Sequence, residues 1–251
     1  MSSTVHLVGA GPGAADLLTL RAARLLGEAE IVFHDALVPE AILDLAPHAE
    51  KIAVGKRSGK HSTAQRFINK RLADAARKHR VVVRLKGGDP MLFGRAQEEI
   101  AYLRSHGIAV EVVPGITAAL AGAADLGVSL TQRGLARSVA FVTPRVGAGE
   151  PASTWVQTVL AADTAAIYMG AGEALQIARA LIDAGKPATT PVAVLENASL
   201  PETRVLAGTL ADLPQLAAQL GGGPVLIVLG EVLRALASAA QLATLRTRQA
   251  R

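Results

Sequence analysis

VVVRLKGGDPMLFGRAQEE, residues 81–99, has the pattern of an apolar strand that ends in a glycine turn and continues into a helix. Gly87 and Gly88 allow backbone angles, or a close approach of another segment, that a side chain would forbid. Pro90 holds the residue before it in an extended conformation. A strand that leads through a turn into a helix is the repeating unit of an α/β fold.

The same turn carries chemically active side chains. Lys86, Asp89 and Arg95 lie within ten residues of one another. Loops at strand ends often position binding and catalytic groups because a rigid sheet supports them. The stretch therefore predicts part of a site as well as part of the fold. Glu99 is interpreted as an acid that only stabilises the start of the helix through its dipole.

Strand-like and helix-like segments alternate along the rest of the chain, with a Pro-Gly break at residues 113–117. This alternation predicts parallel strands joined by right-handed crossovers, and hence an α/β protein of two halves with five strands each. The ten predicted strands are residues 5–8, 31–33, 51–54, 81–85, 110–113, 139–142, 165–169, 192–196, 203–208 and 225–229.

The break divides the chain into two halves of similar size. We expect an N-terminal domain at residues 1–113, a C-terminal domain at 114–240 and a flexible basic tail at 241–251, since four arginines and no acid lie between Val232 and Arg251. Ligands of α/β folds bind at the carboxyl ends of strands, so we expect the active site in the cleft between the domains.

Composition disfavours several classes of function. Aromatic residues make up 3% of the chain, which leaves few rings for stacking nucleic-acid bases. The absence of cysteine removes disulfides, thiolate nucleophiles and cysteine-type zinc sites. No apolar run approaches the roughly 18 residues of a membrane span, and the first residues lead into a strand instead of a signal sequence. We expect a cytoplasmic protein without nucleic-acid or membrane partners.

GAGPGA, residues 9–14, follows the first predicted strand and formally matches the dinucleotide fingerprint G-x-G-x-x-G/A, with Glu30 or Asp35 as the acid that would bind ribose. The next helix is predicted to begin only near Asp16, so a pyrophosphate would not lie at its N-terminus in the usual way. A tight turn that approaches another ligand is the favoured interpretation. A dinucleotide-binding oxidoreductase or regulatory module stays open as an alternative.

Two basic loops, residues 54–62 and 130–138, are either solvated surface or anion-binding segments. The six histidines form no H-x-x-x-H pair, so no metal site is expected. No G-x-S-x-G elbow is present either. Glycine turns with dispersed arginines suit group transfer by positioning of the reactants better than covalent catalysis.

Nine segments, taken together and in order, resemble the uroporphyrinogen-III C-methyltransferases, a branch of the tetrapyrrole methylases (class III methyltransferases). The resemblance extends from about Val5 to Leu233. The segments are VGAGPGAADLLTLRA, HDALV, VGKRSGKHS, VVRLKGGDPMLFGRAQEE, VPGITAA, LTQRG, AIYMG, VLENAS and PVLIVLGEV.

This resemblance implies a homodimer whose subunits have two αβα domains, each around a five-stranded sheet. The subunits would hold S-adenosylmethionine (SAM) in the cleft between the domains and release S-adenosylhomocysteine. The implied reaction methylates uroporphyrinogen III at C2 and C7 to give precorrin-2, for siroheme, cobalamin or related tetrapyrroles. An enzyme with the same fold that methylates another precorrin is the nearest alternative.

The resemblance also implies the site residues. Arg95 is expected to hold a substrate carboxylate, because a guanidinium stays protonated and is a poor base, while Asp35 and Glu98 are the candidates to accept the proton. The implied SAM contacts are Pro12, Gly87, Gly88, Asp89, Leu92, Thr117, Ala118, Met169 and Ala198. Because the implied substrate carries eight carboxylates, we expect substrate contacts from Arg57, Arg95, Arg133 and Arg145, and Met169 is a further expected contact.

Three departures from the family pattern concern the substrate side. Gln132 and Pro144-Arg145 stand where the family commonly has histidine and Gly-His, and Ala96-Gln97 replace a Gly-Gly pair. Any mechanism that uses those histidines is put in doubt. The departures are compatible with a reaction that stops after one methylation, and Arg145 could replace a hydrogen bond with a carboxylate contact.

Overall fold

The computed structural model describes residues 4–54, 65–147, 149 and 153–240. Its contacts divide the chain into two compact units, Met1–Ala118 and Ala119–Arg251. Each unit contains one five-stranded sheet, and every one of the ten predicted strands is present. The predicted α/β class with two five-stranded sheets is therefore confirmed. The predicted tail lies outside the described residues.

The first unit has an all-parallel sheet with the strand order β3-β2-β4-β1-β5. Its strands are β1 Thr4–Gly9, β2 Ile31–His34, β3 Glu50–Ala53, β4 Val81–Lys86 and β5 Ala109–Val113, and its helices are α1 Leu20–Glu28, α2 Glu40–Leu43, α3 Gln65–Ala76 and α4 Ala96–Ser105, with a 3-10 turn η1 Ala15–Leu17.

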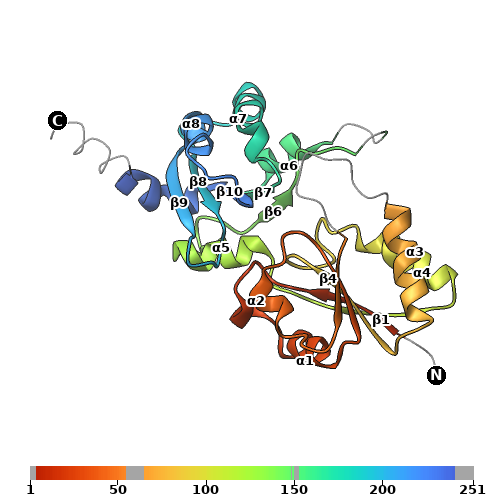
Figure 1. Cartoon of the computed structure of the whole chain (residues 1–251). Helices are drawn as coiled ribbons and strands as arrows, with labels where there is room; N and C mark the ends of the chain where they lie inside the picture. Colours follow the sequence, from red (N-terminus) through yellow and green to blue (C-terminus); the bar gives the residue numbers. More distant parts are fainter. Residues whose placement is uncertain (1–3, 55–64, 148, 150–152, 241–251) are drawn as a thin grey trace. The chain divides into compact units, whose positions relative to one another are not determined.

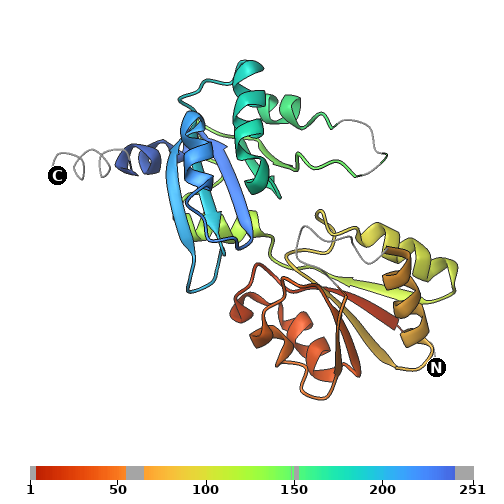
Figure 2. The same ribbon diagram turned by 45° about the horizontal axis from the view of Figure 1, so that its top comes forward.

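Helices cover both faces of this sheet. Figures 1 and 2 show α3 and α4 side by side on one face, and α1 and α2 on the other. Along β4, Val82 packs in the core cluster under α3 and α4, whereas Val83 and Leu85 pack in the cluster under α1 and α2. Because side chains alternate along a strand, Arg84 and Lys86 lie on the face of Val82.

The second unit has a mixed sheet with the order β6-β7-β10-β8-β9. β6 and β7 are parallel, whereas β10 runs antiparallel to both β7 and β8, and β9 antiparallel to β8. Its elements are β6 Val139–Val142, β7 Thr164–Tyr168, β8 Pro191–Glu196, β9 Arg204–Thr209, β10 Val225–Gly230, α5 Ala118–Leu126, α6 Trp155–Ala161, α7 Ala174–Asp183 and α8 Leu213–Ala217, with 3-10 turns η2 Ala171–Glu173, η3 Leu210–Asp212 and η4 Glu231–Leu233.

The parallel pattern predicted from strand and helix alternation is thus correct for the first sheet and wrong for most of the second. Residues 197–203 join β8 to β9 directly, so these strands form a hairpin. The helix α5 contributes Ala119 to the core cluster on one face of the sheet, and α7 contributes Ile177 and Leu181 to the cluster on the other. Across the described ranges, every helix is too short or too polar to cross a membrane.

Three glycines bring the carboxyl ends of β1, β4 and β5 into direct backbone contact. A Cβ built on Gly115 would lie 2.3 Å from the carbonyl oxygen of Gly88, and one built on Gly9 would lie 2.6 Å from the Cα of Gly115. Such distances are too short for any side chain. Gly88 also has a φ of 66°, a left-handed conformation that glycine adopts readily.

Gly115→Ala is expected to lower the free energy of unfolding by about 1–3 kcal/mol, since the methyl group must displace backbone atoms. Gly27→Ala is the matched control: Gly27 lies in α1, and no atom lies within 4 Å of the place that its Cβ would take. The control is expected to raise stability by about 0.5–1 kcal/mol. Urea unfolding followed by circular dichroism measures both, and a Gly115→Ala protein as stable as the wild type would contradict this packing.

Candidate functional site

Three loops at the carboxyl ends of adjacent strands form the candidate site of the first unit. They follow β1 at residues 10–14, β4 at 87–95 and β5 at 114–117. The first two are joined by a pair of backbone hydrogen bonds, from Gly88 N to Gly11 O at 2.7 Å and from Gly11 N to Gly88 O at 3.2 Å. The structure therefore brings together the segments that hold Pro12, the GGDP turn and Thr117.

The carboxylate of Asp89 connects the second and third loops. Its Oδ2 accepts a hydrogen bond from the Gly115 N–H at 2.9 Å, and its Oδ1 accepts one from the Met91 N–H at 2.8 Å. Each carboxylate oxygen thus accepts a hydrogen bond from a backbone N–H group of these loops. Asp89 shapes the surface that a ligand would meet, whether or not it also contacts that ligand.

The segment after the GGDP turn is conformationally strained. Phe93 and Arg95 have φ values of 53° and 54°, in the left-handed region that residues with a Cβ rarely adopt. Gly94 between them could not carry a Cβ, which would lie 2.6 Å from the Pro90 carbonyl oxygen. Strain of this kind persists where the surrounding structure enforces it and is concentrated at functional sites.

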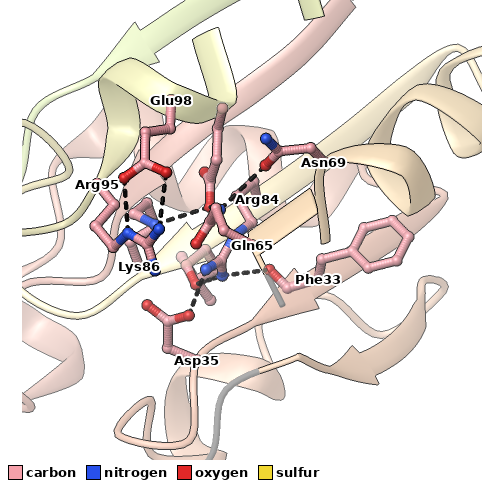
Figure 3. Close-up of polar contacts among 10 residues, drawn as sticks. Phe33, Asp35, Gln65, Asn69, Arg84, Lys86, Arg95 and Glu98 are labelled. Carbon is pink, nitrogen blue, oxygen red and sulfur yellow. Dashed lines mark hydrogen bonds and ion pairs between the residues drawn. The ribbon is translucent and has the colours of Figure 1, made fainter. Parts of the chain in front are cut away.

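Arg95 and Glu98 form a two-pronged ion pair at the start of α4. Arg95 donates from Nε to Glu98 Oε1 and from Nη2 to Oε2, each at 2.7 Å, and both side chains are about half exposed (Figure 3). The hydrogen bonds from Arg95, followed by its charge and that of Lys86, lower the pKa of Glu98, although partial burial opposes them. Glu98 is consequently a weaker proton acceptor than an ordinary glutamate.

A second group of charges lies inside the first unit, between the sheet and α4. Arg84 is 2% exposed, Lys86 3% and Glu99 0%. Glu99 Oε1 accepts hydrogen bonds from Arg84 Nε at 3.2 Å, from Lys86 Nζ at 3.1 Å and from Gln65 Nε2 at 3.0 Å. The interpretation of Glu99 as only a helix-start acid is therefore wrong, because its side chain points into the sheet and is buried among cations.

Arg84 also reaches Asp35, the first residue after β2. Its Nη2 donates to Asp35 Oδ1 at 2.5 Å, and Figure 3 shows the two side chains directed at each other. In the register of β2 and β4, Phe33 lies opposite Arg84, so Asp35 projects on the same face two residues further on. The sequence interpretation treated this strand as apolar and missed Arg84, although an arginine and a lysine on one face of a central strand were a usable signal.

Burial lowers the pKa of Lys86 from its ordinary value, and the neighbouring positive charge of Arg84 acts in the same direction. The carboxylates of Glu99 and Asp35 oppose these effects. The group therefore contains three buried charged side chains, those of Arg84, Lys86 and Glu99, together with the partly exposed carboxylate of Asp35. Glu99 Oε2 is buried without a hydrogen-bond partner among the described residues.

The second unit contains the other predicted contacts. Met169 follows β7 with a φ of 57°, and Ala198 follows β8 between two residues with positive φ, Asn197 and Ser199. β7 and β8 both run antiparallel to β10, so their carboxyl ends share one edge of the sheet. Met169 is 43% exposed and Ala198 is 7% exposed. That these residues complete one site with the first-unit loops stays a prediction.

The remaining predicted substrate residues are three arginines. Arg133 and Arg145 are exposed, and they lie on the loops before and after β6. Arg57 lies outside the described residues. No group of three or more His, Cys, Asp or Glu side chains that could hold a metal ion occurs within the described ranges.

The dinucleotide interpretation does not fit the first loop. The helix α1 begins only at Leu20, capped by Thr19, after a separate 3-10 turn, so the glycine turn does not form a helix N-terminus. Glu30 lies before β2, at the opposite end of that strand from the loops, where it pairs with Arg80. Hydrogen bonds from Arg80 lower the pKa of Glu30.

Known proteins with similar sequences are tetrapyrrole methylases and siroheme synthases, not dinucleotide-binding oxidoreductases. Residues 4–214 match the family of tetrapyrrole (corrin/porphyrin) methylases. The chain is 46% identical to a siroheme synthase of Psychrobacter cryohalolentis over 230 residues, and 47% identical to one of Pseudomonas putida over 232 residues. These matches cover 91% and 92% of the chain but 44% and 50% of the relatives, so the chain spans about half the length of the curated relatives it matches.

Solved structures give the same result. A uroporphyrin-III C-methyl transferase from Thermus thermophilus, complexed with S-adenyl homocysteine, matches with a TM-score of 0.82 and 42% identity over 93% of this chain and all of that chain. A cobalt precorrin-4 methyltransferase matches with a TM-score of 0.80 and 27% identity, over 92% of this chain and 95% of that one. The protein belongs to the tetrapyrrole (corrin/porphyrin) methylases.

Proposed function

We propose that this protein is a SAM-dependent C-methyltransferase that converts uroporphyrinogen III to precorrin-2 by methylation at C2 and C7. The observation that carries this proposal is the match, along the whole solved chain, to a uroporphyrin-III C-methyl transferase with S-adenyl homocysteine bound. A precorrin further along tetrapyrrole synthesis is the second candidate substrate, favoured by the match to the precorrin-4 enzyme.

The three loops of the first unit fit a ligand such as SAM. Gly87 is exposed, and a Cβ there would meet nothing closer than the Leu37 Cβ at 3.9 Å. A ligand can therefore approach the backbone of the GGDP turn closely, and its polar groups can bond to peptide N–H and C=O groups. We assign SAM binding to Pro12, Gly87, Gly88, Asp89, Leu92, Thr117, Ala118, Met169 and Ala198.

We assign Arg95 to substrate binding. Uroporphyrinogen III carries eight carboxylates, and a guanidinium can hold a carboxylate by two parallel hydrogen bonds. Arg95 makes such a pair with the half-exposed carboxylate of Glu98, which supports this assignment. Arg57, Arg133, Arg145 and Met169 are the further proposed substrate contacts.

Bound SAM supplies an activated methyl group that an electron-rich pyrrole carbon can accept directly. The protein's task is then to hold donor and acceptor in line, because positioning alone can lower such a barrier greatly. The methylated ring must lose a proton. We propose Asp35 as the acceptor, because its carboxylate is partly exposed at the carboxyl end of β2, whereas hydrogen bonds from Arg95 lower the pKa of Glu98 in the structure.

A homodimer and a cytoplasmic location complete the proposal. Both rest on the resemblance to the family and on the composition of the chain. Sedimentation equilibrium of the purified protein measures its oligomeric state and so tests the homodimer.

The proposed activity is tested by incubating the pure protein with SAM and anaerobically prepared uroporphyrinogen III. We expect the tetrapyrrole product to gain two methyl groups by mass and S-adenosylhomocysteine to bind in calorimetry. A gain of one methyl group would instead indicate that the reaction stops after the first methylation, as the departures at Gln132 and Arg145 allow. Turnover of a later precorrin with none of uroporphyrinogen III would select the second candidate.

Arg95→Ala is expected to lower kcat/KM for the tetrapyrrole by about 100-fold or more, since charge-assisted hydrogen bonds contribute about 1.5–3 kcal/mol each. S-adenosylhomocysteine affinity should stay within error, because Arg95 is not among the proposed SAM contacts. Arg104→Ala is the matched control, an exposed arginine at the other end of α4. Equal activity of the two variants would remove Arg95 from the site.

Asp89→Ala is expected to weaken S-adenosylhomocysteine binding by about tenfold, because two loop amides lose an acceptor and an unpaired N–H costs about 1–3 kcal/mol. Asp212→Ala is the control: Asp212 likewise accepts from a backbone amide, that of Thr209, which lies opposite the start of β8, whereas Ala198 follows the end of that strand. Calorimetric titration compares the two variants. Unchanged affinity in Asp89→Ala would show that the carboxylate serves only the fold.

A further inference from the structure

The guanidinium of Arg84 is held on three sides by other groups of the first unit. Nε donates to Glu99 Oε1 at 3.2 Å, Nη1 donates to the Leu85 carbonyl at 3.1 Å, and Nη2 donates to Asp35 Oδ1 at 2.5 Å. A planar fork with partners in three directions has little rotational freedom. Arg84 therefore fixes where one oxygen of the Asp35 carboxylate lies.

The two carboxylates on Arg84 differ in their surroundings. The Glu99 side chain is fully buried, whereas the Asp35 side chain is 30% exposed. Asp35 also lies after the carboxyl end of β2, the edge of the sheet where the β1, β4 and β5 loops meet. Arg84 thus connects an acid fixed inside the unit to an acid that reaches its functional edge.

We infer that Arg84 is a positioning residue that sets the direction of the Asp35 carboxylate as proton acceptor, and that Glu99 anchors Arg84 in turn. This inference rests on the proposed function, in which Asp35 takes the proton released after methyl transfer. Arg84 occupies Oδ1 of Asp35, and Oδ2 is the other oxygen of this partly exposed carboxylate. Oδ2 is accordingly the oxygen assigned to accept the proton.

A purely structural role is a weaker account of this arrangement. Charges are costly to bury, and apolar residues of similar volume often stabilise a core as well as a buried ion pair does. Here Arg84 and Lys86 take two inward positions of β4, whose other core positions are Val and Leu. Arg84 pairs with Glu99 of α4 and with Asp35 after β2, and Lys86 pairs with Glu99. Orientation of a group at the site is a function that apolar residues could not supply.

Lysine at position 84 would not reproduce the geometry. Arg84 uses different nitrogens for Glu99 and for Asp35, whereas an ammonium group is a single point of charge. Arg84→Lys therefore keeps the positive charge while it loses the simultaneous hold on both acids. Glu99→Gln keeps the volume and one acceptor oxygen and weakens the anchor without changing Arg84 itself.

A double-mutant cycle of the full chain tests this inference with uroporphyrinogen III and SAM as substrates. Asp35→Asn is expected to lower kcat by about 100-fold, in the range that a positioned base contributes, and Arg84→Lys by about tenfold. If Arg84 acts through Asp35, the double variant should fall within about twofold of Asp35→Asn alone. The KM for the tetrapyrrole and the S-adenosylhomocysteine affinity should change little in Arg84→Lys.

A second double-mutant cycle combines Glu99→Gln with Asp35→Asn, and it tests the inference even if Arg84→Lys does not fold. The kcat of this double variant should also fall within about twofold of that of Asp35→Asn alone. Arg204→Lys is the control, since Arg204 also pairs from a strand with a buried carboxylate, that of Glu196, in the second unit. Thermal unfolding reports the stability of each variant. The control should lose stability without losing kcat.

Additive losses, with the double variant about tenfold slower than Asp35→Asn, would overturn the role of Arg84 and leave the proposed function standing. An unchanged kcat in both Arg84→Lys and Glu99→Gln would overturn it as well. A wild-type protein that does not methylate any tetrapyrrole would overturn the proposed function, and the role of Arg84 with it. The two failures are thus distinguished by the wild-type assay.

Discussion

The contact between Gly9, Gly88 and Gly115 is the constraint on which the first unit depends. No Cβ fits at Gly9 or Gly115, so three strand ends meet as bare backbone. The hydrogen bonds between the first and second loops, and the bridge from Asp89 to Gly115, can form only because the chains approach so closely. A surface of peptide groups results, with polar side chains placed around its margin.

The charged side chains around this surface of peptide groups form ion pairs. Arg95 and Glu98 pair at the surface, and Arg84 and Glu99 pair inside, with Lys86 close to both glutamates. Each of the two glutamates thereby has a defined cationic partner, and the buried guanidinium of Arg84 is held in one orientation. Charges paired in this way are preorganised, which suits the proposed methyl transfer, a reaction that depends on positioning.

Sequence patterns predicted the ten strands and the importance of residues 81–99 because periodicity and glycine turns are local signals. The mixed topology of the second sheet was missed for two reasons: the short link at residues 197–203, which allows only a hairpin of β8 and β9, was not used as a signal, and the direction of β10 depends on its pairing with β7 and β8, which come earlier in the chain. Glu99 was misassigned for a related reason: a helix position does not reveal the strand that it faces. The pairing of Arg84 with Asp35 follows only from the register of β2 and β4, which places Asp35 on the same face.

The strand order of the first sheet also affects how the chain folds. β1 lies between β4 and β5, so its partners are residues 81–86 and 109–113, far along the chain. During synthesis the first strand has no neighbour in the sheet until β4 has left the ribosome. The hairpin of β8 and β9 needs only a short loop to close. Non-local pairing of this kind slows folding and exposes an apolar strand meanwhile, which makes the N-terminal half the one most dependent on protection as it emerges.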